Sequence, residues 1–178
     1  MLGASGYCSY GEIGSKKIYP ELSDAVKVQF TQAILRKTMN TIQKLEDNLN
    51  QHNINPTAMR LLVLEYLMDR EVAVGLTDLY KAFEKSDRIT LYRTLKVFEE
   101  NGMAHSIDDG TGVRKYALCE EGCKCEIERD LHLHFHCSVC NETVCLTNYK
   151  IPKISLPQGY IAENSDFVVT GICKKCSK

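Results

Sequence analysis

Residues 86–118, SDRITLYRTLKVFEENGMAHSIDDGTGVRKYAL, decide the fold of this chain. Large apolar side chains recur there at the i, i+4, i+7 spacing of one helical face, at Leu91, Leu95 and Phe98. Asn101 and Gly102 form a typical helix-ending pair, and two β-type runs then flank a Gly-rich turn at residues 108–112. The stretch predicts a helix followed by a β-hairpin.

Three further helices are expected upstream of this stretch. The first is long, with Ser23 as N-cap and an end near Asn53, and an apolar stripe formed by Ile34, Leu35, Ile42, Leu45 and Leu49. The second runs from the N-cap candidate Thr57 to about Asp69 and is expected to bury Leu61, Leu64, Leu67 and Met68, and the third covers residues 77–85. Helices followed by a hairpin are the order of a winged helix, which we assign to residues 23–118; residues 1–22 stay an unassigned tail.

The composition changes after residue 118. Eight of the nine cysteines lie in the last 60 residues, among β-type runs at residues 131–136, 143–147, 160–163 and 167–172. Pro152 and Pro157 leave little room for a long helix between these runs. Residues 119–178 are therefore expected to form a second, smaller α/β domain, and the fold class is α+β.

Overall composition excludes several classes of protein. With 178 residues, 44% hydrophobic and 25% charged, the chain is expected to be globular. A net charge of −1 gives no general attraction to nucleic acid, so any such contact needs a local basic face. No apolar run suited to a membrane span or signal peptide is seen, so we expect a cytoplasmic protein without a membrane partner, whose clustered cysteines ligate metal.

Two C-x-x-C pairs predict a closed zinc site. Cys137 with Cys140, and Cys173 with Cys176, offer the four thiolates of the tetrahedral shell that structural Zn²⁺ favours.

A second set of candidate ligands precedes the first pair. On a strand, His132, His134 and His136 share one face, and imidazoles suit Zn, Fe or Ni. His136 has an alternative structural role beside the C-x-x-C. The remaining thiols that can complete this site are Cys119, Cys123, Cys125 and Cys145. Cys145 also fits a buried unligated thiol, since it lies in an apolar run.

The fourth helix carries a polar face suited to DNA. Its members are Arg88, Thr90, Tyr92, Arg93, Thr94 and Lys96. Such a face is also found on ordinary solvated helices, but it is followed here by a hairpin with Arg114 and Lys115. We expect Tyr92 and Arg93 to reach base edges in the major groove, with weaker backbone contacts from Arg60, Arg88, Lys96, Arg114 and Lys115.

Taken together, these motifs resemble the ferric uptake regulator family of bacterial metalloregulatory repressors over residues 55–176. The segments that carry the resemblance are TLYRTL (90–95), FEENG (98–102), RKYAL (114–118), the His-x-His before C-x-x-C, and GICKKC (171–176). The resemblance implies a homodimer in which the winged helix binds double-stranded DNA and the C-terminal domain dimerises and binds metal.

Departures from the family pattern concern the sensing site. Compared with the family, Cys145 replaces an acid, Ala73 replaces a histidine and Ala117 replaces another acid. A further family site is missing, because Leu131, Leu133 and Ser165 stand at its ligand positions. We expect a regulatory metal held by His132, His134 and Cys145 with at least one of Cys119, Cys123 and Cys125, of which Cys125 is favoured. Sulfur favours zinc over ferrous iron, as in the zinc uptake regulators that the site resembles.

The sequence predicts a metal-responsive repressor that binds palindromic operator DNA, with one structural Zn²⁺ and a second Zn²⁺ or Fe²⁺ as effector. A peroxide-sensing regulator of the same family is one alternative, and a zinc-binding protein-interaction module without DNA contact is another. An enzyme with a small organic substrate is not expected, because no His-Glu-x-x-His motif and no His-x-Glu paired with C-x-x-C occurs.

Overall fold

The computed structural model describes residues 23–119, 132–151, 155–161 and 167–178. The chain divides into two units at Thr41/Ile42, and helix α1 (Asp24–Gln51) spans this boundary. Within the described residues, no helix has both the length and the apolar character needed to cross a membrane.

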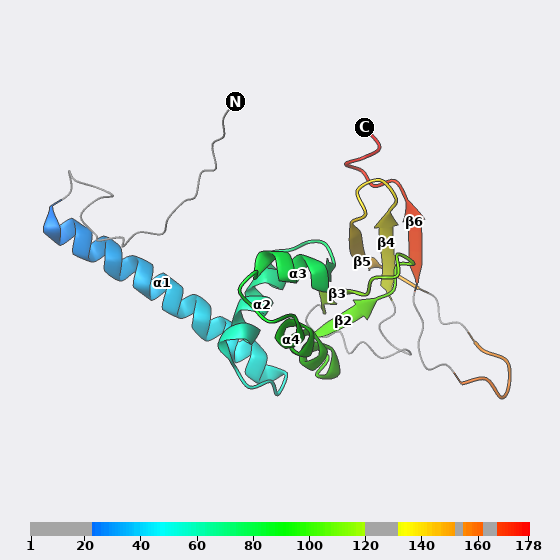
Figure 1. Cartoon of the computed structure of the whole chain (residues 1–178), viewed down its shortest axis with the longest axis horizontal. Coiled ribbons are helices and arrows are strands. Elements are labelled where there is room, and N and C mark those ends of the chain that lie inside the picture. The colour runs from blue at the N-terminus through cyan, green and yellow to red at the C-terminus, as the bar shows by residue number, and fades with distance from the viewer. Residues whose placement is uncertain (1–22, 120–131, 152–154, 162–166) are drawn as a thin grey trace, which may run out of the picture. The chain divides into compact units, whose positions relative to one another are not determined.

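In the second unit, the C-terminal end of α1 is followed by a winged helix (Figure 1). Its elements are α2 (Ala58–Met68), β1 (Val74–Gly75), α3 (Leu76–Ala82), α4 (Arg88–Glu100), β2 (Ala104–Ile107) and β3 (Lys115–Leu118). The strands form an antiparallel sheet in the order β1-β3-β2. The two-residue strand β1 was not expected from the sequence.

Capping residues at both ends set the length of α4. The carboxylate of Asp87 accepts a hydrogen bond from the Thr90 N–H at 3.0 Å and so serves as N-cap. At the other end, the Met103 N–H donates to Phe98 O at 2.9 Å and the Gly102 N–H donates to Glu99 O at 3.1 Å. These bonds form a Schellman motif, which requires the positive φ of 66° found at Gly102. The chain therefore turns from α4 directly into β2.

The apolar face of α4 is the centre of the core. Leu91, Leu95 and Phe98 are all fully buried, as their spacing predicted. They belong to a cluster with Leu49, Val63, Leu64, Leu67 and Leu79. On α2 the prediction was partly wrong, because Met68 is 55% exposed and Val63 takes an inward position instead.

The apolar stripe expected on α1 is buried only at its C-terminal end. Leu45 and Leu49 join the core, whereas Ile34, Leu35 and Ile42 are about half exposed. In the described part of the first unit, residues 23–41, α1 is the one helix or strand.

A second three-stranded sheet follows the winged helix. It contains β4 (His132–Cys137), β5 (Thr143–Lys150) and β6 (Val168–Gly171) in the order β5-β4-β6. Strand β4 pairs antiparallel with β5 and parallel with β6. The prediction of a strand at residues 160–163 was wrong for Tyr160 and Ile161, which are exposed and follow the positive-φ turn at Gly159. Residues 162 and 163 lie outside the described part.

Replacing Leu91 by alanine tests the assigned core. Because Leu91 is fully buried, Leu91→Ala is expected to lower the free energy of unfolding by about 2–5 kcal/mol. The matched control Leu62→Ala removes a leucine that is 45% exposed and is expected to cost less than about 1 kcal/mol. Urea unfolding followed by circular dichroism measures both, and equal losses would contradict this core.

Candidate metal centres and nucleic-acid face

The structure brings the four cysteines of the two C-x-x-C pairs together. One sulfur from each of Cys137, Cys140, Cys173 and Cys176 lies within 4.8 Å of every other. The Cys140 and Cys173 sulfurs are 3.9 Å apart. A tetrahedral Zn²⁺ with bonds of about 2.3 Å to sulfur separates its ligands by about 3.8 Å, so the spacing fits zinc.

Strand register produces this arrangement. Cys137 ends β4 and is the parallel partner of Gly171 at the end of β6, so the two cysteine turns leave the sheet side by side. The Ser138 N–H donates to Gly171 O at 2.8 Å and fixes the first turn to β6. A side chain at residue 171 would place its Cβ 3.2 Å from the Phe135 ring, so glycine permits this close approach.

The charges of the four thiols call for a cation. Backbone N–H groups, those of Cys140 and Cys173 foremost, lower the pKa of Cys137 to about 6 and favour its thiolate. A hydrogen bond with the Cys173 thiol, followed by burial and by contacts with the Cys140 and Cys137 thiols, raises the pKa of Cys176 to about 12 and disfavours a second thiolate beside the first. A divalent cation removes this conflict by stabilising all four thiolates, and the donor set therefore fits a structural zinc.

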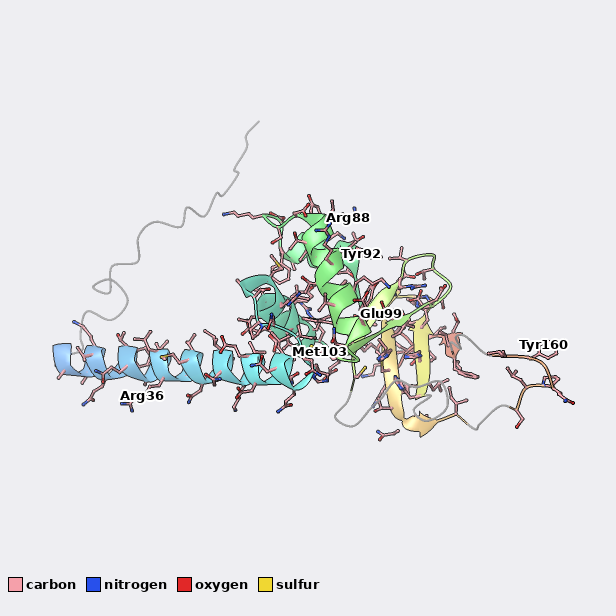
Figure 2. The ribbon with its side chains drawn as sticks, turned by 90° about the horizontal axis from the view of Figure 1, so that it is seen from below. Arg36, Arg88, Tyr92, Glu99, Met103 and Tyr160 are labelled. Atoms are coloured by element: carbon pink, nitrogen blue, oxygen red, sulfur yellow. The ribbon has the colours of Figure 1, made fainter. Side chains whose placement is uncertain are left out.

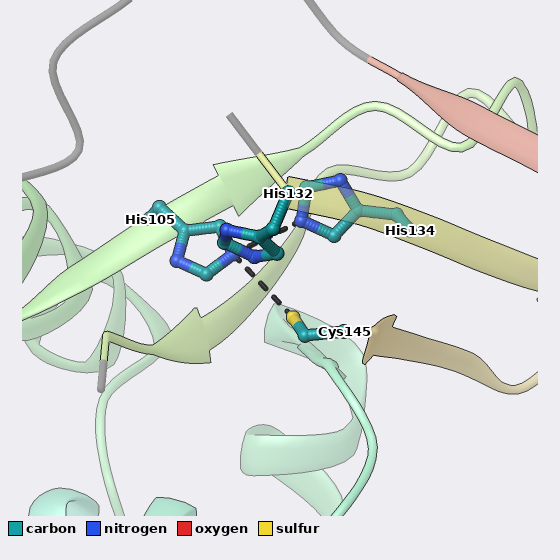
Figure 3. A group of neighbouring side chains, drawn as sticks. All are labelled: His105, His132, His134 and Cys145. Carbon is teal, nitrogen blue, oxygen red and sulfur yellow. Dashed lines mark hydrogen bonds between the residues drawn. The ribbon is translucent and has the colours of Figure 1, made fainter. Parts of the chain in front are cut away.

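A second cluster consists of His105, His132, His134 and Cys145, whose ligand atoms also lie within 4.8 Å of one another (Figure 3). His105 comes from β2, the histidines of β4 come from alternate positions on one face, and Cys145 is the β5 partner of His134. The cluster thus joins side chains from both sheets.

The atoms of this second cluster face one another closely. His105 Nε2 lies 3.1 Å from His134 Nε2 and 3.5 Å from Cys145 Sγ. Burial, followed by the charges of His132 and His105, lowers the pKa of His134 to about 4, so its imidazole is neutral at pH 7. Among the described residues His134 Nδ1 is buried without a hydrogen-bond partner. Three imidazoles and a thiol are ligands suited to a borderline divalent ion such as Zn²⁺.

His105 is the cluster member that sequence reasoning missed. The available signal was composition, because His105 is one of only five histidines in the chain and lies in a predicted strand. Cys119 contacts the other ring nitrogen, with Sγ 3.5 Å from His105 Nδ1. Ala73 lies with Cys119 and Cys145 in the wall of a cleft of about 330 Å³. Cys123 and Cys125 lie outside the described residues.

The third histidine of the strand has a different environment. His136 Nδ1 lies 3.0 Å from Thr143 Oγ1 and 3.3 Å from Asp109 Oδ2, both buried. His136 therefore belongs to a polar cluster apart from both candidate metal centres.

Helix α4 presents the side chains expected to contact DNA. Arg88 and Tyr92 lie on this helix (Figure 2). Arg88 and Arg93 are exposed, and Tyr92 is 44% exposed. Arg114 is exposed in the wing, the segment of residues 108–114 between β2 and β3. Thr94 does not belong to this face: it is buried, and its hydroxyl donates to Thr90 O at 2.9 Å.

Three other cations proposed for DNA backbone contacts have protein partners. Lys96 pairs with Glu99 at 2.6 Å, and Arg60 Nη1 donates to Asn55 O at 2.7 Å. Lys115 pairs with the buried Asp109 at 2.7 Å. Arg88, Arg93 and Arg114 are thus the better placed cations for a polyanion.

The sequence model of the Ferric uptake regulator family matches residues 51–173. The chain belongs to the ferric uptake regulator family. The match covers the winged helix and both candidate metal centres, and it confirms the resemblance seen in the motifs. This family consists of metal-responsive regulators rather than enzymes.

Individual members of the ferric uptake regulator family are distant in sequence. A peroxide operon regulator of Bacillus subtilis is 24% identical over 143 residues, covering 74% of this chain and 90% of the relative. A ferric uptake regulation protein of Campylobacter jejuni is 25% identical over 149 residues, covering 76% and 88%. The structure of a zinc uptake regulator with zinc and DNA is 20% identical, covers 79% of this chain and 95% of that chain, and has a TM-score of 0.55. The α+β fold class, a winged helix followed by an α/β domain, is confirmed.

Removing one cysteine tests the four-cysteine site. Cys173→Ser is expected to lose the chelator-resistant zinc and to unfold the C-terminal domain, because structural zinc supplies on the order of 10 kcal/mol of apparent binding energy. Elemental analysis after dialysis against chelator gives the zinc content per chain, and sedimentation gives the oligomeric state. Cys119→Ser is the control and should keep its zinc; retention of tightly bound zinc in a dimeric Cys173→Ser would contradict the assignment.

Proposed function

We propose that this protein is a metal-responsive transcriptional repressor that binds palindromic operator DNA as a dimer. The observation that carries the proposal is the second cluster, in which His105 of the winged helix lies against three ligands of the C-terminal sheet. An ion held there ties the DNA-binding part to the C-terminal domain. A protein-interaction module without DNA contact would not need a metal ion that links the winged helix to the C-terminal sheet, so this geometry favours the DNA-binding function.

The two centres have different proposed roles. Cys137, Cys140, Cys173 and Cys176 hold a structural Zn²⁺ that maintains the C-terminal domain. His105, His132, His134 and Cys145 hold the regulatory ion, and Cys119 contacts His105 from its other side. A thiolate with three imidazoles favours zinc as effector, with ferrous iron second.

Regulation follows from a shift between two arrangements of the winged helix and the C-terminal sheet. The four ligands come from three strands and must be brought together, so binding favours the arrangement in which they converge. A preference of about 10⁴-fold for that arrangement, roughly 5.5 kcal/mol, moves a population from 1:99 to 99:1. This arrangement is the one we assign to DNA binding.

The DNA contacts are assigned to α4 and the wing. Tyr92 and Arg93 enter the major groove, and Arg88 and Arg114 contact phosphates, with smaller roles for Arg60, Lys96 and Lys115. Two copies related by a two-fold axis read two half-sites of a palindrome.

Replacing two histidines tests the regulatory centre. His132→Ala/His134→Ala is expected to keep the structural zinc, the fold and the dimer but to lose zinc-dependent DNA binding, and His105→Ala should behave in the same way. Fluorescence anisotropy on promoter fragments, titrated with zinc or ferrous iron, measures the response. His52→Ala is the matched control and should respond like the wild type; a wild-type response in the double variant would place sensing elsewhere.

Replacements on α4 and in the wing separate base reading from backbone contact. Tyr92→Ala is expected to cost about 1–3 kcal/mol of binding free energy at the preferred site alone. Arg114→Ala is expected to weaken binding to all sequences and to reduce the slope of log affinity against log salt by about 1.

The control for Tyr92→Ala is Tyr80→Ala, because Tyr80 is 43% exposed and Tyr92 is 44% exposed. Binding isotherms on specific and unrelated duplexes at several salt concentrations distinguish the effects. Equal losses on every sequence for Tyr92→Ala would assign Tyr92 a packing role.

A further inference from the structure

A buried polar cluster outside both candidate metal centres joins the wing to strands β4 and β5. We call it the Asp109 cluster, and its members are Asp109, Lys115, His136 and Thr143. The side chain of Asp109 is fully buried, and those of Lys115 and His136 are 12% and 7% exposed. Thr143 is fully buried as well, so its hydroxyl is not accessible to a substrate. We therefore assign this cluster a structural role.

The hydrogen bonds of the Asp109 cluster are mutually consistent. Asp109 Oδ2 accepts from Lys115 Nζ at 2.7 Å and from the Thr143 hydroxyl at 2.5 Å. Because that hydroxyl has one proton, Thr143 Oγ1 must accept from Lys115 Nζ and from His136 Nδ1, each at 3.0 Å. The charges of Asp109 and Lys115 balance within the cluster.

The second oxygen of Asp109 holds the turn of the wing. Asp109 Oδ1 accepts from the Thr111 N–H at 3.1 Å and from the Thr111 hydroxyl. Burial alone would raise the pKa of Asp109, but hydrogen bonds from Lys115, Thr111 and Thr143 outweigh it and hold the pKa well below its usual range. Asp109 therefore stays charged and connects the wing turn with β5.

The Asp109 cluster contacts both sides of the first cysteine turn. His136 directly precedes Cys137, and Asn141 directly follows Cys140. Lys115 Nζ donates to Asn141 O at 2.7 Å. The residues that enter and leave the C-x-x-C turn are thus bonded to the side chains that hold the wing.

We infer that Asp109 and Lys115 are positioning residues that hold the wing against the first cysteine turn, so that metal in the four-cysteine site fixes the wing for DNA binding. This inference rests on the proposed function for its DNA-binding part. Metal held by Cys137 and Cys140 fixes the backbone of His136 and Asn141, and these residues fix Lys115 and Asp109. Moving the wing away from β3 and β5 takes Asp109 from its Lys115 and Thr143 donors and breaks a buried charge pair, which is strongly unfavourable.

Hydrogen exchange in the full-length protein tests the coupling without DNA. Amides of residues 108–114 are followed in the zinc-loaded protein, in the protein chelated under conditions that remove both ions, and in zinc-loaded His132→Ala/His134→Ala, with amides of α4 as internal reference. The double variant keeps the four-cysteine zinc and should keep a slowly exchanging wing, so it separates the two centres. Chelation is expected to speed exchange in the wing by about tenfold or more while the α4 core stays protected. In Asp109→Asn and Lys115→Met the wing should exchange fast with or without zinc.

Asp108→Asn is the matched control. Asp108 is exposed in the same turn, and among the described residues its carboxylate accepts a local bond from the Gly110 N–H, so this variant should keep the zinc dependence of the wild-type wing. If either Asp109→Asn or Lys115→Met fails to fold, the other variant and the chelated wild type still test whether zinc and the wing are coupled. A wing whose exchange is independent of zinc in the wild type, or still zinc-dependent in Asp109→Asn, would overturn the inference.

A DNA-binding measurement separates this inference from the proposed function. Asp109→Asn with normal zinc content is expected to bind all duplexes about tenfold more weakly than the wild type, as expected for a wing that has lost its fixed place. Failure of the wild type to bind any DNA would overturn the proposed function, whereas the exchange result would still decide the coupling. Wild-type affinity in an Asp109→Asn variant with a fast-exchanging wing would remove the DNA-binding part of the inference.

Discussion

Strand β4 lies between β5 and β6, and its register determines every candidate site in the second sheet. Alternation puts His132, His134 and His136 on one face, and their positions along the strand place the first two in the histidine cluster and His136 beside Asp109. Cys137 ends the strand beside Gly171. Because side chains alternate with period two, a shift by one residue would turn the histidines to the opposite face and replace them with Leu133 and Phe135. Both centres and the Asp109 cluster would then lose ligands or contacts together.

The two candidate centres use this register in different ways. The four-cysteine centre takes its ligands from two turns at the same end of one parallel strand pair, which makes it local to the C-terminal sheet. The histidine centre also takes His105 from β2 and therefore depends on how the two sheets are placed. This difference is the physical basis for assigning a structural role to the first and a regulatory role to the second.

Features set by local spacing were predictable from the sequence, and features set by tertiary contact were not. Leu91, Leu95 and Phe98 follow one helical period, and each C-x-x-C turn is contained in four residues, so their grouping needs no knowledge of the fold. His105 contacts a residue 29 positions away, and Lys115 contacts a hydroxyl 28 positions away. Spacing therefore gave no reason to place His105 beside a metal, and it made Lys115 a candidate DNA contact instead of a partner of Asp109.

The position of His105 also has a consequence for metal exchange. Since one proposed ligand belongs to the winged helix and three to the C-terminal sheet, the affinity for the proposed regulatory ion would depend on how firmly these parts are held together. By thermodynamic reciprocity, an operator that is bound more tightly in the presence of the ion must raise the affinity for that ion by the same factor. If the proposed function holds, copies bound to DNA would lose this ion last when metal becomes scarce, and copies free of DNA would lose it first.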